Sequence, residues 1–311
     1  MPGPVMVTGS RGFAGRPLVA GLRAAGCRVV GLDLQPAEHP DDRCVDLSRA
    51  DLIGAIVANE HPDRVCHLAG MAIEPADAEG RARLLNANIG MTLGLLDALV
   101  AAGCHCRFLL AGSCSVYGIP LRSDGRVVES DPVAPILYYG FTKAAQEELV
   151  RVYHRRGSID LLVARLFNVT GPGEGPGTVL GAVARQIHSG AAALRLGNVD
   201  TVRDFLDVRD AASAFRAILE RGQAGLAYNV GCGNGETVRD RVLALSQAAG
   251  MACLIQRDEA RVKPVDVKCI VADTKRLREL GWQAEFDAAS TSRDLMAWLA
   301  TRGTGVGPAA G

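Results

Sequence analysis

The sequence lacks net charge, because 34 lysine and arginine residues balance 34 aspartate and glutamate residues. A balanced chain has no basic field with which to attract nucleic acid or an anionic membrane, so neither is an expected partner. We find no apolar run long enough to cross a membrane, and residues 1–7 lead directly into a predicted strand rather than forming a signal peptide. We therefore expect a cytoplasmic protein.

Cysteine clusters are scarce in the sequence, and so are aromatic residues. The nine cysteines are scattered singly, except in Cys104-His105-Cys106, which is too tight and too isolated for a zinc site, so we expect no metal. Aromatic residues are only 5% of a chain that is 48% hydrophobic, which indicates a core of small aliphatic residues. With 311 residues, the chain can form one large core or two closely joined lobes.

Glycine is abundant, and its first cluster follows an apolar run at residues 4–7. The turn reads Thr8-Gly9-Ser10-Arg11-Gly12-Phe13-Ala14-Gly15, and a helical pattern follows it. Strand, glycine turn and helix in this order are typical of a dinucleotide site. Gly9 permits the sharp turn, Gly12 lets the backbone approach a pyrophosphate, and Gly15 lets the helix pack closely. The first helical turn offers N–H groups to the phosphates.

Asp33 ends the second apolar strand, where a carboxylate can accept hydrogen bonds from the adenosine ribose. It favours NAD over NADP, because a 2′-phosphate would meet a like charge. Arg11 keeps NADP open, since its guanidinium can pair with a phosphate; the alternative is a solvated loop arginine. Asp46, before Leu47, either faces an adenine amino group or caps the helix expected from Ala50.

Strands and helices alternate through the first half of the chain. Further strands are expected at residues 64–70 and 107–112, with a long helix at 81–102 between them. Five such units predict an α/β fold with a Rossmann-type doubly wound parallel sheet. Because ligands bind at the carboxyl ends of parallel strands, the same edge is expected to carry Gly9, Asp33, Ala69 and Ser113.

A tyrosine and a lysine stand four residues apart in Tyr138-Tyr139-Gly140-Phe141-Thr142-Lys143, near the start of a helix expected over residues 135–156. Positions i and i+4 share a helix face, so Tyr139 and Lys143 can point into one pocket. We expect the ammonium to stabilise a phenolate and lower the tyrosine pKa from its usual value of about 10. The pair is a candidate proton-transfer device.

Together these segments resemble the extended short-chain dehydrogenase/reductase family, of the NAD-dependent epimerase/dehydratase type. The resemblance covers nearly the whole chain and is carried by the glycine turn, by Asn88, and by residues 113–118, 139–143, 165–173 and 202–210. Within the family, Gly197-Asn198 before Val202-Arg203-Asp204-Phe205, and the glycine-rich turn at 171–177, most resemble the GDP-4-keto-6-deoxymannose reductases.

The resemblance implies a cofactor and three catalytic residues. Tyr139 would be the acid/base on a sugar hydroxyl or ketone, Lys143 would lower its pKa and bind the nicotinamide ribose, and Ser113 would hydrogen-bond the reacting oxygen. The cofactor, which supplies the hydride, is expected to be NAD, with NADP possible. Its predicted contacts are Gly9, Arg11, Gly12, Phe13, Gly15, Asp33, Asp46, Leu47, Leu68, Ala69, Asn88, Tyr139, Lys143 and Leu166.

The implied substrate is a nucleotide-diphosphate sugar. Arg203 is the candidate for the diphosphate, because guanidinium matches phosphate in a bidentate way; the alternative is an ion pair with Asp204 or Asp207. Arg261 and Lys263 compete for a further phosphate contact. The predicted substrate contacts are Ser113, Cys114, Ser115, Asn168, Val179, Arg203 and Arg261.

The reaction most favoured is reduction at C4 of a nucleotide 4-keto-6-deoxysugar, and the alternative is a 4-epimerase, which Asp33 favours through its preference for NAD. Cys114 and Ser115 stand where the family's 4,6-dehydratases carry carboxylates, so a 4,6- or 5,6-dehydratase is less favoured. A non-enzymatic dinucleotide sensor is least favoured, because such relatives usually lose the Tyr-Lys pair.

We predict a Rossmann domain at residues 1–168, to which 202–232 return, and a smaller α/β substrate lobe formed by 169–201 and 233–302. Residues 303–311 read as a flexible tail. The resemblance implies a homodimer formed through the helices after the fourth and fifth strands, although the chain's own core can equally cover their apolar faces.

Overall fold

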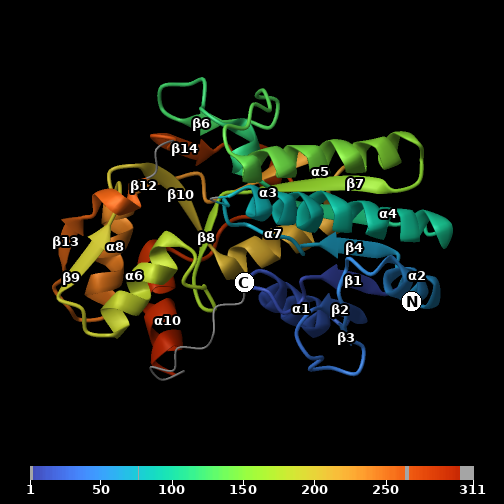
Figure 1. Cartoon of the computed structure of the whole chain (residues 1–311), viewed down its shortest axis with the longest axis horizontal. Coiled ribbons are helices and arrows are strands. Elements are labelled where there is room, and N and C mark those ends of the chain that lie inside the picture. The colour runs from blue at the N-terminus through green and yellow to red at the C-terminus, as the bar shows by residue number, and fades with distance from the viewer. Residues whose placement is uncertain (1–2, 76, 263–265, 302–311) are drawn as a thin grey trace.

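The structure is a computed structural model that describes residues 3–75, 77–262 and 266–301. These residues form a large α/β lobe, on the right in Figure 1, and a smaller lobe on the left. The predicted tail at 303–311 lies outside the described residues. The domain boundaries stay a prediction.

The large lobe is built on one parallel sheet, which within the described residues has the strand order β11-β7-β5-β4-β1-β2-β3. The chain starts in the middle of the sheet and adds strands first on one side and then on the other, which is doubly wound topology. This confirms the predicted fold class. The strands are β1 (Val5–Thr8), β2 (Val29–Asp33), β3 (Arg43–Cys44), β4 (Arg64–His67), β5 (Arg107–Ser113), β7 (Asp160–Leu166) and β11 (Ala227–Val230).

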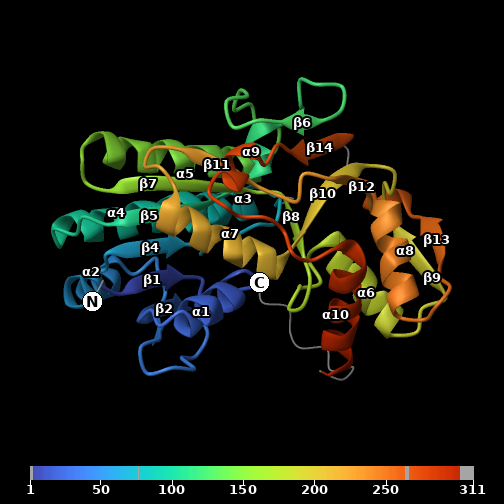
Figure 2. The same cartoon turned by 180° about the vertical axis from the view of Figure 1, so that it is seen from behind.

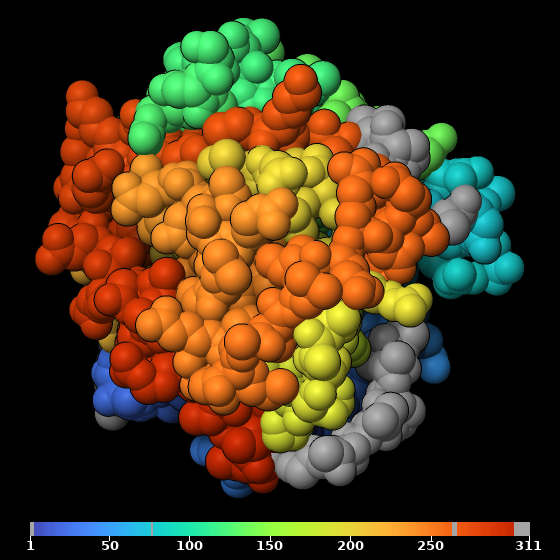
Figure 3. Space-filling model, turned by 90° about the vertical axis from the view of Figure 1, so that its left-hand side faces the viewer, coloured from blue at the N-terminus to red at the C-terminus, as the bar shows by residue number. Residues whose placement is uncertain are grey.

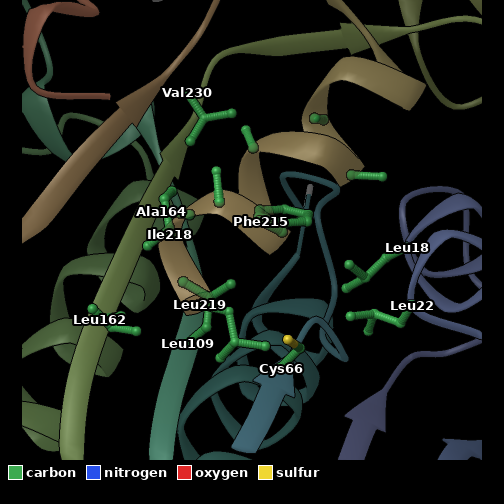
Figure 4. Packing of buried hydrophobic residues seen from close by; sticks show 14 of the residues in the cluster. Leu18, Leu22, Cys66, Leu109, Leu162, Ala164, Phe215, Ile218, Leu219 and Val230 are labelled. Atoms are coloured by element: carbon green, nitrogen blue, oxygen red, sulfur yellow. The ribbon is translucent and has the colours of Figure 1, made fainter. Parts of the chain in front are cut away.

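Helices cover both faces of this sheet because every central strand is apolar on both sides. On one face, α1 (Gly15–Ala24) and α7 (Val208–Arg221) bury an apolar cluster against the strands. Figure 4 shows this packing, in which the labelled side chains include Leu18, Leu22, Phe215, Leu109 and Leu162. The other face is covered by α2 (Ala50–Glu60), α4 (Met91–Ala101) and α5 (Tyr138–Arg155).

One continuous helical run precedes β5. It consists of α3 (Ala78–Leu85), the π-helical turn η1 (Asn86–Gly90) and α4. Among the described residues, Ala78–Ala101 is long and apolar enough to span a membrane by length and composition, so our expectation that no such run exists is wrong. The apolar face of α4 packs on the sheet, where Leu95, Leu96 and Leu99 are buried, as in a covering helix of a Rossmann sheet.

The small lobe has its own apolar cluster, between α6 (Val179–His188), α8 (Val238–Ala248) and α10 (Ala288–Ala300). Figure 2 shows α8 and α10 from behind, and Figure 3 shows the outer face of the lobe. Its strands are β6 (Arg126–Val127), β8 (Asn168–Thr170), β9 (Ala193–Leu196), β10 (Val202–Asp207), β12 (Gly235–Thr237), β13 (Leu254–Arg257) and β14 (Cys269–Ala272). The short helices are η2 (Cys114–Tyr117), η3 (Glu259–Arg261) and α9 (Lys275–Arg278).

Strand β10 joins the small lobe to the large one. It pairs with β12 and β14 through its first residues and with β8 through its last, and α7 follows it directly. Arg203, on β10, is thereby brought to the same side of the molecule as Asn168, on β8. Two of the predicted substrate residues, Arg203 and Asn168, therefore lie on paired strands.

A buried ion pair ties α5 to the sheet. Glu147, on α5, accepts two hydrogen bonds from the guanidinium of Arg165, on β7, at 2.9 and 2.8 Å, and one from Arg151 at 2.9 Å. The Arg165 guanidinium also donates to the Tyr117 hydroxyl, 3.0 Å away. Since Glu147 is fully buried, its charge depends on these partners.

We expect Glu147→Gln to destabilise the protein by about 3–5 kcal/mol, because it leaves the Arg165 guanidinium buried without a matching charge. Urea unfolding followed by circular dichroism measures this loss. Glu148→Gln is the control, since Glu148 is an exposed neighbour and its ion pairs are worth at most about 1 kcal/mol. Equal losses in the two variants would contradict the importance of the buried pair.

Candidate functional site

The predicted cofactor residues lie along the carboxyl edge of the large sheet. The glycine turn follows β1, Asp33 ends β2, Asp46 and Leu47 follow β3, Leu68 and Ala69 follow β4, and Leu166 ends β7. Asn88 lies in the π-helical turn. Phe13 packs against the glycine-rich turn of the small lobe, because its ring would lie 3.5 Å from a Cβ placed on Gly173.

The glycine turn has the close packing that a dinucleotide requires. A Cβ at Gly15 would lie 2.0 Å from the Gly9 carbonyl oxygen, so only glycine allows α1 to start here. The buried Ser10 Oγ and Arg11 Nε have no hydrogen-bond partner among the described residues. Unpaired buried polar atoms beside a helix N-terminus fit the phosphates of a dinucleotide.

Asp33 is held in place by the glycine turn. One carboxylate oxygen accepts the Arg11 backbone N–H at 2.9 Å, and the other accepts that of Gln35 at 3.0 Å. The Arg11 guanidinium pairs with Glu38 and with the Pro36 carbonyl, so the solvated loop arginine that we considered as an alternative is wrong.

Asp46 does not cap the helix. The N-cap of α2 is Arg49, with no side-chain cap, and the Asp46 carboxylate instead accepts the Ser48 N–H at 2.9 Å. This hydrogen bond lowers the pKa of Asp46. Its contact with an adenine stays a prediction.

Lys143 lies beside Tyr139, as the four-residue spacing predicts. The lysine Nζ is 5.9 Å from the centre of the Tyr139 ring and donates to the Ala111 carbonyl at 3.0 Å. Burial lowers the pKa of Lys143 to about 8, and Glu147 partly opposes this shift.

The pKa of Tyr139 moves in the direction opposite to our expectation. Loss of water around the hydroxyl raises it to about 12, and a hydrogen bond with Ser113 only partly opposes the rise. Burial therefore decides the direction of the shift in this structure. Tyr139 is a neutral phenol at neutral pH.

All seven predicted substrate residues line one cavity of about 470 Å³, together with Tyr139 and Leu166. Ser113, Cys114 and Ser115 lie at the end with Tyr139, following β5. Asn168, Val179, Arg203 and Arg261 enter the cavity from the small lobe. The cavity therefore joins a proton-transfer group to two guanidinium groups from the other lobe.

Arg203 forms an ion pair, but the predicted partners, Asp204 and Asp207, are wrong. Arg203 pairs with Asp266 at 2.6 Å, whereas Asp204 accepts backbone N–H groups and Asp207 pairs with Arg209. Arg261 pairs with Asp258 at 3.3 Å. Lys263, its competitor for the phosphate, lies outside the described residues.

Tyr117 and Tyr138 do not compete with Tyr139 for the acid/base role. Tyr117 is buried in an apolar cluster and donates to Asn229 at 2.6 Å, as a packing residue should. Tyr138 is exposed, and its ring centre lies 5.0 Å from the guanidinium carbon of Arg81, outside the lining of the cavity.

A buried polar chain links the glycine turn to α5. His67 joins Thr8 at 2.7 Å to Thr92 at 2.9 Å, and Gln146 donates to the Thr92 hydroxyl at 2.7 Å. Burial lowers the pKa of His67 to about 3, so the ring is neutral. The polar residues on the apolar helix before β5 were the signal of this chain.

Asn88 belongs to the same buried layer. Its amide donates to the Thr142 hydroxyl at 2.9 Å and exchanges two hydrogen bonds with the Met71 backbone. Thr142 lies one residue before Lys143, so Asn88 holds α5 from the helix that precedes β5. Its predicted contact with a cofactor stays a prediction.

Sequence reasoning missed two carboxylates in the cavity. Glu74 accepts the backbone N–H groups of Tyr138 and Tyr139 at 3.0 and 2.9 Å. Glu174 accepts from Thr170 at 2.6 Å and from the Gly171 N–H at 3.2 Å, which holds the glycine-rich turn. The Glu74 contact joins segments far apart in the sequence, so no local motif marks it, whereas the Glu174 contacts lie within four residues of that glutamate.

A doubly wound sheet with a glycine turn, a Tyr-Lys pair and an inter-lobe cavity defines a dinucleotide-dependent enzyme of the short-chain dehydrogenase type. Residues 5–231 match the model of the NAD dependent epimerase/dehydratase family. The chain belongs to this family, which confirms the predicted family and enzyme class.

Individual relatives cover almost the whole chain. GDP-6-deoxy-D-mannose reductase from Pseudomonas aeruginosa is 34% identical over 94% of this chain and 95% of its own. A solved structure of RMD from Pseudomonas aeruginosa complexed with NADPH has a TM-score of 0.85 at 32% identity, over 97% and 99% of the two chains. UDP-glucose 4-epimerase from Thermus thermophilus complexed with NAD has a TM-score of 0.86 at 27% identity, over 96% and 99%.

We expect the Lys143 ammonium of the folded protein to titrate near pH 8. In the unfolded chain its pKa is about 10.4. Since the unfolded chain binds the proton more tightly, this group makes the protein more stable as pH rises between these values. Nitrogen NMR of the lysine side chains, with Lys143→Met to assign the signal, measures the titration. A folded-state value above 10 would contradict the burial argument.

Proposed function

We propose that the protein is an NAD(P)-dependent reductase that acts at C4 of a nucleotide-diphosphate 4-keto-6-deoxysugar. The observation that carries the proposal is the cavity in which Tyr139, Ser113, Arg203 and Arg261 meet. The likeness to GDP-6-deoxy-D-mannose reductase over nearly the full chain supports a 6-deoxysugar substrate. The proposal does not specify the nucleotide base, because the predicted substrate contacts are to the sugar and the diphosphate.

Tyr139 donates the proton of the reduction. Addition of hydride to the C4 carbonyl carbon leaves a negative oxygen, and the Tyr139 hydroxyl gives its proton to that oxygen to form the alcohol. The step needs a protonated tyrosine, and the raised pKa of Tyr139 keeps its phenol protonated at neutral pH. Ser113 hydrogen-bonds the same oxygen as its charge develops.

The glycine turn and Lys143 hold the dinucleotide. NAD(P)H supplies the hydride when it is bound. Ser10 and Arg11 contribute polar atoms that can hydrogen-bond its phosphates. Asp33 accepts hydrogen bonds from the adenosine ribose. Lys143 binds the nicotinamide ribose beside Tyr139. Asp33 favours NAD, and NADP is the alternative because the Arg11 guanidinium can pair with a phosphate.

Arg203 and Arg261 bind the diphosphate. Both guanidinium groups line the cavity from the small lobe, and each has a single carboxylate partner. A phosphate can share such a guanidinium, because its planar fork offers five N–H donors. Asn168 and Val179 complete the substrate contacts, with Asn168 directed to the sugar or diphosphate.

Elimination of water is disfavoured by the same cavity. Loss of water around the Cys114 thiol raises its pKa to about 12, and Ser115 is no stronger an acid, so neither replaces a carboxylate. Glu74 and Glu174 are engaged by backbone N–H groups and threonine hydroxyls. A 4-epimerase remains the second candidate, favoured by Asp33 and by the likeness to the NAD complex of UDP-glucose 4-epimerase.

Product stoichiometry tests the proposal. With GDP- and dTDP-linked 4-keto-6-deoxysugars and NADH or NADPH, we expect one nicotinamide to be oxidised for each sugar reduced at C4. Protein that carries NAD from purification, and that interconverts two sugars without consuming cofactor, would instead be an epimerase. Turnover with neither sugar class, together with a conformational change on NAD binding, would support the sensor.

Tyr139→Phe provides the catalytic control. Removal of the proton donor is expected to lower kcat by about 10²- to 10⁴-fold while dinucleotide binding persists. Tyr138→Phe is the matched variant, because that exposed ring precedes Tyr139 in the sequence, and we expect its turnover to stay within a few-fold of wild type. Turnover near wild type in Tyr139→Phe would overturn the assignment.

We also propose a cytoplasmic homodimer formed through α4 and α5, which lie side by side in Figure 1. The outer faces of the two helices expose Leu93, Val100, Phe141 and Val152. A second copy of the same pair would bury these side chains in a four-helix arrangement with two-fold symmetry.

Leu93→Glu places a charge in the proposed contact and is expected to convert the dimer into a monomer. Light scattering after size-exclusion chromatography measures the mass. Leu243→Glu, on the exposed face of α8, is the control and should remain dimeric. A wild-type mass equal to one chain would refute the dimer.

A further inference from the structure

The helix that carries Tyr139 has no cap of its own. Its N-cap residue is Leu137, which makes no side-chain capping hydrogen bond. The first four N–H groups of a helix have no partner within the helix, and a leucine cannot supply an acceptor. The position of Tyr139 in the first turn of α5 therefore depends on groups from elsewhere in the chain.

Glu74 supplies the missing acceptor from the loop after β4. Its Oε1 accepts the Tyr138 N–H at 3.0 Å, and its Oε2 accepts the Tyr139 N–H at 2.9 Å. Hydrogen bonds to a carboxylate are stronger than those between neutral groups, and a negative charge is favoured at a helix N-terminus. One side chain thus binds the backbone N–H groups of two consecutive residues, Tyr138 and Tyr139.

The opposite side of the same turn is closed by close packing. A Cβ at Gly140 would lie 2.5 Å from the Ser115 carbonyl oxygen, in the segment that follows Ser113. The first turn of α5 is thus held between Glu74 and the backbone after β5. Glu74 also lines the cavity that contains Ser113 and Tyr139.

We propose that Glu74 is a positioning residue, which sets the Tyr139 hydroxyl against Ser113 and the reacting oxygen by capping α5 across the site. The proposal rests on the proposed role of Tyr139 as proton donor. Misplacement of a reacting group by about 1 Å can cost about 100-fold in rate, so a loosened first turn should appear in kcat. A residue that only bound the sugar would instead alter KM.

Amide hydrogen exchange tests the contact without any ligand. In Glu74→Ala, we expect the Tyr138 and Tyr139 amides to exchange about 10- to 100-fold faster, because each loses its charged acceptor. Glu79→Ala is the control, since Glu79 is exposed and pairs with Arg83. Unchanged exchange at both amides in Glu74→Ala would overturn the proposal.

Steady-state kinetics test the consequence. Glu74→Ala is expected to lower kcat by roughly 10- to 100-fold with KM for the sugar within a few-fold of wild type. Glu74→Gln keeps one acceptor oxygen and should recover part of the loss. A raised KM with unchanged kcat, or no recovery in Glu74→Gln, would refute positioning through the cap.

A double-mutant cycle separates this proposal from the proposed function. If Glu74 acts through Tyr139, Glu74→Ala should have little further effect on the residual rate of Tyr139→Phe. Full additivity would overturn the positioning role while leaving Tyr139 as the proton donor. If Tyr139→Phe itself retained wild-type turnover, the proposed function would fail, and the exchange experiment would still decide whether Glu74 caps α5.

Discussion

Parallel pairing of the central strands is the constraint on which the candidate site depends. Pairing aligns Thr8 with His67 and Ser113 with Leu166, so the residues that leave neighbouring strands emerge along one edge. The glycine turn, Asp33 and Ser113 need no direct contact with one another to be brought together. Their common position follows from the direction of the strands.

Two kinds of buried contact then hold α5 against this edge. The Glu147–Arg165 pair fixes the middle of the helix to β7, and the Asn88–Thr142 hydrogen bond fixes its beginning to the π-helical turn. Both contacts flank Lys143. The lysine is buried where its charge is costly, and the Ala111 carbonyl that accepts its hydrogen bond and the charge of Glu147 offset part of that cost.

The fold, the glycine turn after β1 and the proximity of Tyr139 to Lys143 could be predicted because their signals are local. The glycine turn, the apolar strands and the Tyr139–Lys143 spacing each occupy a few consecutive residues. The contacts of Glu74 with α5 and of Arg203 with Asp266 could not be predicted in the same way, because they join segments more than sixty residues apart. The raised pKa of Tyr139 was missed for a similar reason, since the sequence reveals the neighbouring charge but not the loss of water.

The π-helical turn at Asn86–Gly90 has a consequence for how sequences of this family can vary in length. A π turn holds one residue more than an α turn, so removing one residue here would leave a regular α-helix whose two ends still face the same way. A deletion between Thr92 and Leu95 would instead turn the rest of α4 by about 100° and move Leu95 and Leu99 away from the sheet on which they pack. The π-helical turn is therefore the point in the helix before β5 where the loss of one residue disturbs the packing least.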